Sequence, residues 1–463
     1  MKSLWFKKAV RLVSGLTIVA LLSTAVACGA QKQAEPAATE PAKTEAAKET
    51  DKKADGKPVT IKIITWAQQS NIDPLNALNA KFSEKNPNVK FVIDSVNAND
   101  YPTLQQTRIS AGDVDIVTGF AFDQVPQDYM KGVDKRAWQQ FVESGAYLDI
   151  TDQPFLKNWD PAMIKDAASY KGKVYGINVG KVGFNGVFYN KKIFADNGLS
   201  EPKTWEELMN ICKTLKAKNI TPFTGAAKDS WPINMMAHAF IAANEPDMPA
   251  YSKGLWTGER KFTDEGSMKI WNRVEEWSTY FEKGVAGIDY SSVVGRFVAK
   301  KAAMMPDGTW DSGTIDAAKP DFEYGYFCIP GDTAGAEPIQ LAGKYDLQFQ
   351  IYSKTANKDI CLKWMEFLSQ KENYTPFISA LSMFPTMPDV QVSNKFINSI
   401  ADKNKNFRLA FERITLEPKG VGQYAAGVFP LTQLKAFGGT IATAKELAEL
   451  QQKDWDAAVK AAK

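Results

Sequence analysis

Histidine and cysteine are scarce in this chain of 463 residues. There is one histidine, His238, and there are four cysteines: Cys28, Cys212, Cys328 and Cys361. A histidine-based catalytic triad, or a metal site built from several histidines, has too few side chains to work with. The wide spacing of the cysteines is unlike a disulfide framework. We therefore expect no catalytic residue, no metal and no cofactor, a His238 that packs in the core, and buried free thiols at the last three cysteines.

A surplus of positive charge is also lacking. The formal net charge is +3, but the first 27 residues hold four basic and no acidic side chains, and the rest of the chain carries −1. A protein that binds nucleic acid needs a basic surface to neutralise phosphates, so nucleic acid is not an expected partner. The composition is 44% hydrophobic and 24% charged. With this length, it predicts a globular chain of two lobes, each of about 150 to 200 residues.

Long apolar runs are confined to the N-terminus. Basic residues precede the run Leu12 to Ala27, a pattern that predicts a secretory signal over residues 1–27. The sequence Ala25-Val26-Ala27-Cys28-Gly29 resembles the lipobox of bacterial lipoproteins, which implies a lipid anchor on Cys28 and a location on the outer face of the cell membrane. Lipoboxes usually carry leucine where this chain has Ala25, and simple cleavage after an A-x-A site is the alternative.

Residues 28–58 contain no aliphatic residue larger than alanine and no aromatic residue. Such a segment cannot bury enough apolar surface to fold, so we expect a disordered tether. A flexible coil of this length has an r.m.s. reach of about 30 Å. It would hold the folded part of the chain near a membrane.

The segment after the tether alternates strands and helices. Val59 to Trp66 and Val89 to Ile93 are predicted strands, Asp73 and Pro74 are predicted to start a helix between them, and Asp113 to Gly119 is predicted as a third strand. This order implies a largely parallel sheet covered by helices, whose ligands lie beyond the carboxyl ends of the strands. The residues predicted at this edge are Trp66, Gln68, Gln69, Phe120 and Asp123.

The stretch Val174 to Phe194 has four glycines at near-regular intervals in strand-like sequence. Glycine inside a strand marks a bend, a bulge or a close approach. One interpretation is a twisted hairpin with glycine turns. The other is a crossover between two lobes, in which Lys181, Phe184 and Asn185 line a cleft.

The residues that follow carry a specific resemblance. Tyr189-Asn190-Lys191-Lys192-Ile193-Phe194 and Gly198 to Leu208, GLSEPKTWEEL, resemble the family of extracellular solute-binding proteins that serve ABC importers, in particular the sugar-binding branch that includes the maltose-binding protein. Further along, Lys300 to Asp311, KKAAMMPDGTWD, resembles the family's segment G-x-x-A-M-x-x-x-G-x-W, which ends in a G-x-W turn. The resemblance extends from about Val59 to the C-terminus.

The resemblance implies a fold and a function. The fold is α/β and of the two-lobe periplasmic-binding-protein-like (type II) kind, each lobe a largely parallel sheet flanked by helices, the lobes joined by hinge crossovers. It places residues 59–178 and 329–372 in an N-terminal lobe and 179–328 and 373–463 in a C-terminal lobe, with further crossings near 326–331 and 368–374. The implied protein is a monomer that captures a carbohydrate between its lobes, delivers it to ABC permease subunits and performs no reaction.

A sugar ring has an apolar face and a rim of hydroxyl groups, so its site needs aromatic side chains and planar hydrogen-bonding groups. The aromatic candidates are Trp310, where the family places a stacking tryptophan, then Trp231 and Trp66. The polar candidates are Asp123, Gln68, Asn185, Asp311 and Asp346. Close maltose-binding relatives carry an acidic residue where this chain has Gly183, which argues against maltodextrin.

Three alternatives remain open. The solute could be something other than a sugar. Carboxylates beside tryptophans are also typical of glycoside hydrolases, although no hydrolase motif is recognisable. A surface adhesin or sensor would share every feature and differ only in its partner.

Overall fold

The computed structural model describes residues 56–122, 125–332 and 340–462. The predicted signal, the lipidation site Cys28, the tether up to residue 55 and the candidate ligand Asp123 lie outside these residues. No helix among the described residues is both long enough and apolar enough to cross a bilayer.

The larger sheet has seven strands and contains the first three strands of the chain. Its order is β11-β6-β10-β3-β1-β2, with β12 paired to β10. Strand β1 (Val59–Trp66) pairs in parallel with β2 (Val89–Val96) and with β3 (Ile116–Gly119). Strand β10 (Ala342–Ile351) runs antiparallel to β3 and to β6 (Ile177–Gly183). The predicted parallel part is confirmed for β1 to β3, and the sheet as a whole is mixed.

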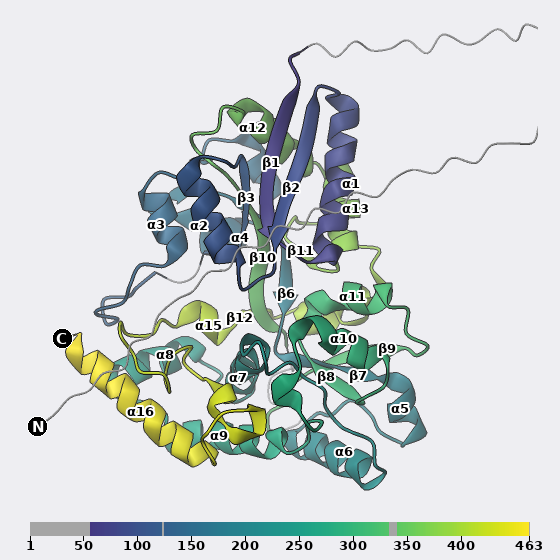
Figure 1. The fold of residues 1–463 in the computed structure, drawn as a ribbon, viewed down its shortest axis with the longest axis vertical. Helices are drawn as coiled ribbons and strands as arrows, with labels where there is room; N and C mark the ends of the chain where they lie inside the picture. The colour runs from purple at the N-terminus through teal and green to yellow at the C-terminus, as the bar shows by residue number, and fades with distance from the viewer. Residues whose placement is uncertain (1–55, 123–124, 333–339, 463) are drawn as a thin grey trace, which may run out of the picture. The chain divides into compact units, whose positions relative to one another are not determined.

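Helices cover this sheet (Figure 1). Helix α1 (Gln69–Lys85) and helix α13 (Lys371–Leu381) pack side by side, and α2 (Tyr101–Ala111) packs on β1 and β2. The predicted start of α1 at Asp73 is wrong, because the carbonyl of Gln68 already accepts from the amides of Asn71 and Ile72. The helix thus begins directly after β1 and carries Pro74 inside it.

The smaller sheet has three strands in the order β8-β7-β9. Strand β7 (Gly186–Asn190) is antiparallel to both β8 (Met304–Pro306) and β9 (Tyr324–Cys328). The prediction of a largely parallel sheet in each lobe is therefore wrong for this sheet. The connection from β7 to β8 reverses the direction of the chain, and β9 runs the same way as β8, so both neighbours of the central strand β7 are antiparallel to it.

The chain passes from the larger to the smaller sheet at Phe184 and Asn185, between β6 and β7. This confirms the crossover interpretation of the glycine-containing stretch and excludes the hairpin. A return passage follows β9 and leads into β10. The short strand β11 (Phe384–Pro385) still pairs with β6, and α13 still packs on α1. The third passage therefore lies after Pro385 and not at residues 368–374.

The other helices and strands complete the described chain, and the last helix, α16, packs against α9 (Figure 1). Their bounds are α3 (Ala137–Glu143), α4 (Pro161–Met163), β4 (Ser169–Tyr170), β5 (Lys173–Val174), α5 (Lys191–Asp196), α6 (Trp205–Ala217), α7 (Trp231–Asn244), α8 (Met248–Thr257), α9 (Glu265–Ser278), α10 (Tyr290–Val298), α11 (Ser312–Ala317), α12 (Lys358–Leu368), α14 (Lys395–Ser399), β12 (Arg408–Leu409), α15 (Phe411–Ile414) and α16 (Ala444–Ala461).

The three cysteines within the described residues are buried and form no disulfide, which confirms the prediction of free thiols. Burial raises the pKa of Cys328 to about 12, so this thiol stays protonated at neutral pH. These cysteines belong to the core and do not contribute a reactive group.

Candidate functional site

The first part of the candidate site is the Trp66–Phe120 pair. Trp66 is the last residue of β1, and Phe120 follows the last residue of β3. Their rings stack with centroids 4.8 Å apart and an interplanar angle of 21°. Trp66 is buried, whereas Phe120 is 41% exposed and is one of few large apolar side chains on the surface of the described residues. At the carboxyl ends of the neighbouring parallel strands β1 and β3, the ring of Phe120 is thus exposed to solvent, and the ring of Trp66 is stacked against it.

Gln68 holds the Trp66 ring of this pair through a hydrogen bond. Its Oε1 accepts hydrogen bonds from the indole Nε1 of Trp66 at 3.3 Å and from Nδ2 of Asn71 at 3.2 Å. Gln69, by contrast, is exposed on the first turn of α1, where its side chain binds Asp73. Of these two candidates, the structure brings Gln68 to the aromatic pair and places Gln69 on the helix surface.

The second part is the Trp310 group, which consists of Trp310, Trp231 and Tyr290. Trp310 lies in a 3₁₀ turn, Thr309–Asp311, directly before α11. A Cβ atom on Gly308 would come within 2.2 Å of the Trp310 ring, so only glycine allows the indole to lie against this backbone. The Thr309 hydroxyl accepts a hydrogen bond from Gly183 N at 3.1 Å. This bond ties the turn to the end of β6.

Hydrogen bonds fix the orientation of Trp310. Its Nε1 donates to the Tyr290 hydroxyl at 2.6 Å, and that hydroxyl lies 3.1 Å from Oδ2 of Asp311 and 3.4 Å from Oδ1 of Asp307. Since Trp310 supplies the proton to the Tyr290 oxygen, the tyrosine O–H is free to donate to a carboxylate. Trp231 packs against Tyr290 with ring centroids 4.5 Å apart. The group therefore has a preformed geometry.

Two buried carboxyl groups lie under this tryptophan. Burial is the main cause that raises the pKa of Asp307 well above its usual range, and the charge of Asp311 raises it further. Burial also raises the pKa of Asp311 to about 6, against the lowering effect of its hydrogen bonds to Asp307 and Tyr290. The two carboxyl groups titrate as a coupled pair, in which burial favours the protonated forms. A shared proton lets two carboxyl groups be buried together.

Lys344 lies between the two aromatic parts. Its ammonium nitrogen is 4.0 Å from the ring centroid of Phe120 and 5.7 Å from that of Trp310. It is also 3.5 Å from Oδ2 of Asp346, and both residues are buried. Burial lowers the pKa of Lys344, although Asp346 raises it. Lys344 shows that the Trp66–Phe120 pair and the Trp310 group face the same space.

Lys181 lies on the face of the crossing strands opposite to that of Lys344. It pairs with Tyr345 across β6 and β10, and its amino group sits 5.2 Å from the ring of Phe407. Lys344 pairs with the next residue, Val182. Residues that pair across two strands point to the same face, and successive residues of one strand point to opposite faces. A shift of the pairing by one residue would therefore change which face of the sheet Lys344 occupies relative to Lys181.

Phe184 and Asn185 are buried in the crossing between the two sheets. Phe184 is 1% exposed and backs Trp310 at a centroid distance of 6.1 Å. The Asn185 amide donates to the carbonyl of Gln340 at 3.0 Å and accepts from the amide of Ala342 at 2.9 Å. Both ends of the Asn185 side chain thus bind the backbone of the segment that leads into β10.

The remaining candidates lie in or beside the site. Trp231 is half-buried at the start of α7, with its ring centroid 6.4 Å from that of Trp310. Asp311 and Asp346 are buried and hold Tyr290 and Lys344, respectively. The structure thus brings together Trp66, Gln68, Phe120, Trp231, Trp310, Asp311 and Asp346.

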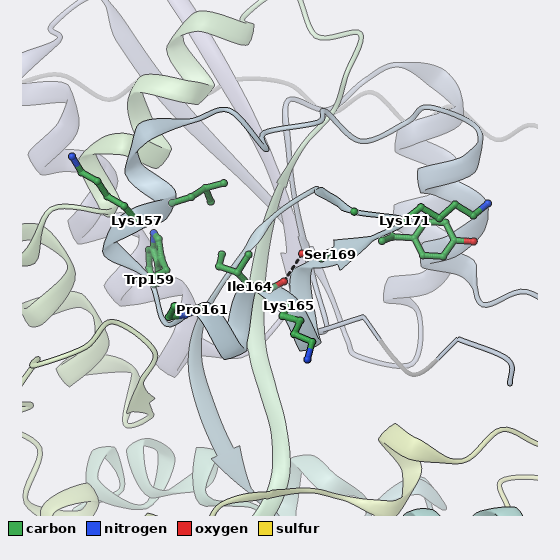
Figure 2. Close-up of a pocket in the computed structure, with 10 residues that line it drawn as sticks. Lys157, Trp159, Pro161, Ile164, Lys165, Ser169 and Lys171 are labelled. Carbon is green, nitrogen blue, oxygen red and sulfur yellow. Dashed lines mark hydrogen bonds between the residues drawn. The ribbon is translucent and has the colours of Figure 1, made fainter.

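A separate hollow of about 600 Å³ lies on the segment from Leu156 to Gly172 and includes none of these residues. Its floor includes Trp159, which is buried and donates from Nε1 to Ser369 Oγ at 2.9 Å. Figure 2 shows Lys157 and Lys171 at opposite ends of this hollow, with their amino groups pointing away from its middle. The hollow therefore offers no convergent set of polar groups of the kind that a ligand site needs.

Sequence reasoning missed several residues of the site. Tyr290 and Asp307 hold Trp310, Lys344 bridges the aromatic parts, and Arg413 lies with its guanidinium carbon 5.9 Å from the Phe120 ring. Asp307 could have been found, because it stands three residues before Trp310 in the G-x-W segment. Lys344 and Tyr290 carry no local signal, since long-range strand and helix packing brings them here.

Comparisons with known proteins show the family of this chain. Residues 67–375 match the family model described as bacterial extracellular solute-binding protein. A multiple sugar-binding protein of Streptococcus mutans is 26% identical over 333 residues, which cover 69% of this chain and 73% of that protein. The melibiose/raffinose/stachyose-binding protein MelE of Bacillus subtilis is 24% identical over 311 residues, 63% of this chain and 66% of its own.

Solved structures share the fold. RafE in complex with raffinose superposes with a TM-score of 0.69 at 21% identity and covers 86% of this chain and 99% of its own. A chitin oligosaccharide binding protein has the same TM-score at 23% identity, over 88% of this chain and 100% of its own. The two-lobe type II fold expected from the sequence is thereby confirmed. The family match spans most of the folded part, and the chain belongs to the family of bacterial extracellular solute-binding proteins.

Proposed function

We propose that this protein captures a carbohydrate, in particular an oligosaccharide, between the Trp66–Phe120 pair and the Trp310 group, and delivers it to the permease of an ABC importer. It works outside the cytoplasm as a monomer and is held to the outer face of the membrane by a lipid on Cys28. The proposed lobes are residues 59–183 with 329–385 and residues 184–328 with 386–463. They close on the solute about the crossing strands β6 and β10.

One observation carries the proposal. Phe120 and Trp310 both lie within 6 Å of the single ammonium group of Lys344, at 4.0 Å and 5.7 Å from their ring centroids. Two aromatic faces directed at one space suit the apolar C–H face of a sugar ring, and stacking on an aromatic ring contributes about 1 kcal/mol beyond the buried area. Lys344 and Asp346 supply hydrogen-bonding partners for hydroxyl groups.

The relatives support the same class of solute. RafE was solved with raffinose, and a sugar transporter of Bacillus licheniformis with stachyose. The multiple sugar-binding protein and MelE carry sugars in their names. An oligosaccharide of this size is the natural first probe for this chain.

The carboxyl groups argue for binding and against hydrolysis. In a glycoside hydrolase the two carboxyl groups flank the scissile bond on opposite sides of it. Here Asp307 and Asp311 are both within 3.4 Å of the same Tyr290 hydroxyl and are buried next to Trp310. They act on the tyrosine and hold the aromatic side chain, and the protein is proposed to release its sugar unchanged.

A ligand screen tests this proposal. The full chain is titrated with galactose, melibiose, raffinose, stachyose, chitotriose, xylotriose, spermidine and a tripeptide while tryptophan fluorescence and the melting temperature are recorded. A solute that binds only the folded state raises the melting temperature. We expect at least one oligosaccharide to shift both signals and to be recovered intact. Shifts with spermidine or the peptide alone would refute the sugar, and recovery of cleaved sugar would show an enzyme.

A further inference from the structure

A contact between the two proposed lobes joins the loop before α3 to the segment after α15 and to the end of α16. The backbone amide of Lys419 donates to the carbonyl of Gly132 at 3.0 Å, and the Lys419 ammonium nitrogen lies 2.8 Å from Oδ1 of Asp134. Gly132 also lies against Ala462, because a Cβ atom on this glycine would come within 2.5 Å of the Ala462 Cβ. In Figure 1 the last turn of α16 lies beside the loop that leads into α3. We call Gly132, Lys419 and Ala462 the Gly132 contact.

The loop that carries Gly132 is fixed to the N-terminal lobe. Between Gly132 and α3, Nε2 of Gln140 donates to the carbonyl of Lys135 at 2.9 Å. Helix α3 is itself held beside the larger sheet, because Trp138 stacks on Phe122, just after β3, with ring centroids 4.3 Å apart and an interplanar angle of 11°. A loop supported in this way moves with the N-terminal lobe.

The other side of the contact is fixed to the C-terminal lobe. The indole of Trp256 on α8 donates to the carbonyl of Leu416 at 2.9 Å, three residues before Lys419. The indole of Trp455 on α16 donates to the carbonyl of Leu255 at 3.0 Å, and the rings of Trp256 and Trp455 meet edge to face at 5.4 Å. Helix α8 therefore holds both the segment before Lys419 and helix α16.

The backbone at Gly132 carries most of this contact. The ion pair of Lys419 and Asp134 contributes little, because their side chains are 65% and 68% exposed. Gly132 has a φ of +68°, and a side chain there would collide with Ala462. The contact joins two lobes and is made only when they are close together. An interaction made in one of two conformations shifts the equilibrium toward that conformation.

We propose that the Gly132 contact is a latch, which holds the two lobes closed and has to break before a solute can leave. Every atom of the latch belongs to the chain, so it forms with or without a solute. The inference rests on the closure of the lobes in the proposed function. It adds a contact outside the aromatic site that sets how often the cleft opens, whichever solute is bound.

The test uses the full chain without solute. Gly132→Ala places a Cβ atom against Ala462 and should open the latch. Gly145→Ala is the matched control, because Gly145 lies in the same lobe with a φ of +73° but a Cβ atom there meets no atom within 4 Å. Combining Gly132→Ala with Ala462→Gly removes the opposing Cβ atom and should restore the latch. Ala462→Val enlarges the contact from the side of α16 and gives the same test if Gly132→Ala fails to fold.

Hydrogen exchange with mass spectrometry reports on the peptide that contains Lys419, and small-angle X-ray scattering reports on the separation of the lobes. We expect Gly132→Ala to speed exchange at Lys419 about tenfold, the effect of losing one backbone hydrogen bond and its packing, and to increase the radius of gyration. Exchange in Gly145→Ala and in the double variant should stay within twofold of the wild type. Melting temperatures show that each variant is folded.

Unprotected exchange at Lys419 in the wild type, or equal exchange in the wild type and Gly132→Ala, would overturn the latch. Equal changes in Gly132→Ala and Gly145→Ala would also overturn it, because the strain of a positive φ would then be the cause. None of these measurements requires a solute. A failed latch therefore leaves the proposed sugar binding intact, and a ligand screen that finds no sugar leaves the latch intact.

Discussion

The two aromatic parts of the site are built differently. Phe120 rests on Trp66, has no polar atom of its own and is 41% exposed beneath the cations Lys344 and Arg413. Trp310 is 9% exposed and is held by a hydrogen bond to Tyr290. The first part can adjust to its ligand, whereas the second is fixed before the ligand arrives. Preorganised contacts contribute more to affinity because less conformational entropy is lost on binding.

The largest expected effect is at the fixed part. Trp310→Ala should weaken oligosaccharide binding about 30-fold, because it removes a preorganised aromatic face of the kind that forms binding hot spots. Calorimetry with raffinose or chitotriose measures the loss. The melting temperature without ligand should fall by only a few degrees, since Trp310 lies at the edge of the core. A variant that fails to fold would show that Trp310 is primarily a core residue.

Gly308→Ala tests whether the backbone against which Trp310 lies matters. The new Cβ would come within 2.2 Å of the indole, so the ring has to move. We expect a loss of affinity of about tenfold, smaller than that of Trp310→Ala because the displaced ring still offers an apolar face. Gly287→Ala, where a Cβ would meet no atom within 4 Å, is the matched control and should bind normally. Normal binding by Gly308→Ala would mean that the fixed geometry of Trp310 is not required.

At the adjustable part, Phe120→Ala should weaken binding about fivefold, the cost of one stacking contact made by a partly exposed ring. Trp66 lies directly beneath and can take over part of the contact. The same calorimetric titration compares this variant with Trp310→Ala. A loss larger than that of Trp310→Ala would reverse the comparison between the two parts.

The smallest effect concerns stability and pH. Burial raises the folded-state pKa of Asp307 well above its usual value and that of Asp311 to about 6. A carboxyl group with a raised pKa contributes stability that is present below pH 4 and is lost as pH rises through the folded-state value. Asp307→Asn mimics the protonated form, so its melting temperature should exceed that of the wild type by a few degrees at pH 7.5, and the difference should vanish at pH 4.

The exposed Asp152→Asn variant serves as the control for this series and should follow the wild type at both values of pH. A constant difference between Asp307→Asn and the wild type from pH 4 to 7.5 would contradict the shared proton.

Local patterns in the sequence were sufficient to predict the first strand and the crossover between the two sheets. The bounds of β1 were predicted to the residue, because its β-branched run ends at a polar segment, and the crossover at Phe184 and Asn185 was recognisable from its glycines and the family motif that follows. Trp310 was predicted as a site residue from the G-x-W turn, and the close approach of Gly308 to its ring explains the glycine in that turn.

Long-range pairing determined what the sequence could not show. Whether Lys181 or Lys344 faces the aromatic site depends on the register between β6 and β10, strands that lie about 160 positions apart in the chain. Tyr290 reaches Trp310 only because α10 packs beside α11. The antiparallel order of the smaller sheet depends in the same way on contacts between distant segments.

A crystal structure of the full chain with raffinose or chitotriose, whichever binds more tightly in solution, tests the central claim most directly. The account predicts one sugar ring stacked on Phe120 and in contact with Trp310, with the ammonium group of Lys344 moved from above Phe120 to a sugar hydroxyl. A sugar bound in the hollow beside Trp159 and Tyr170, with Lys344 still over Phe120, would contradict it.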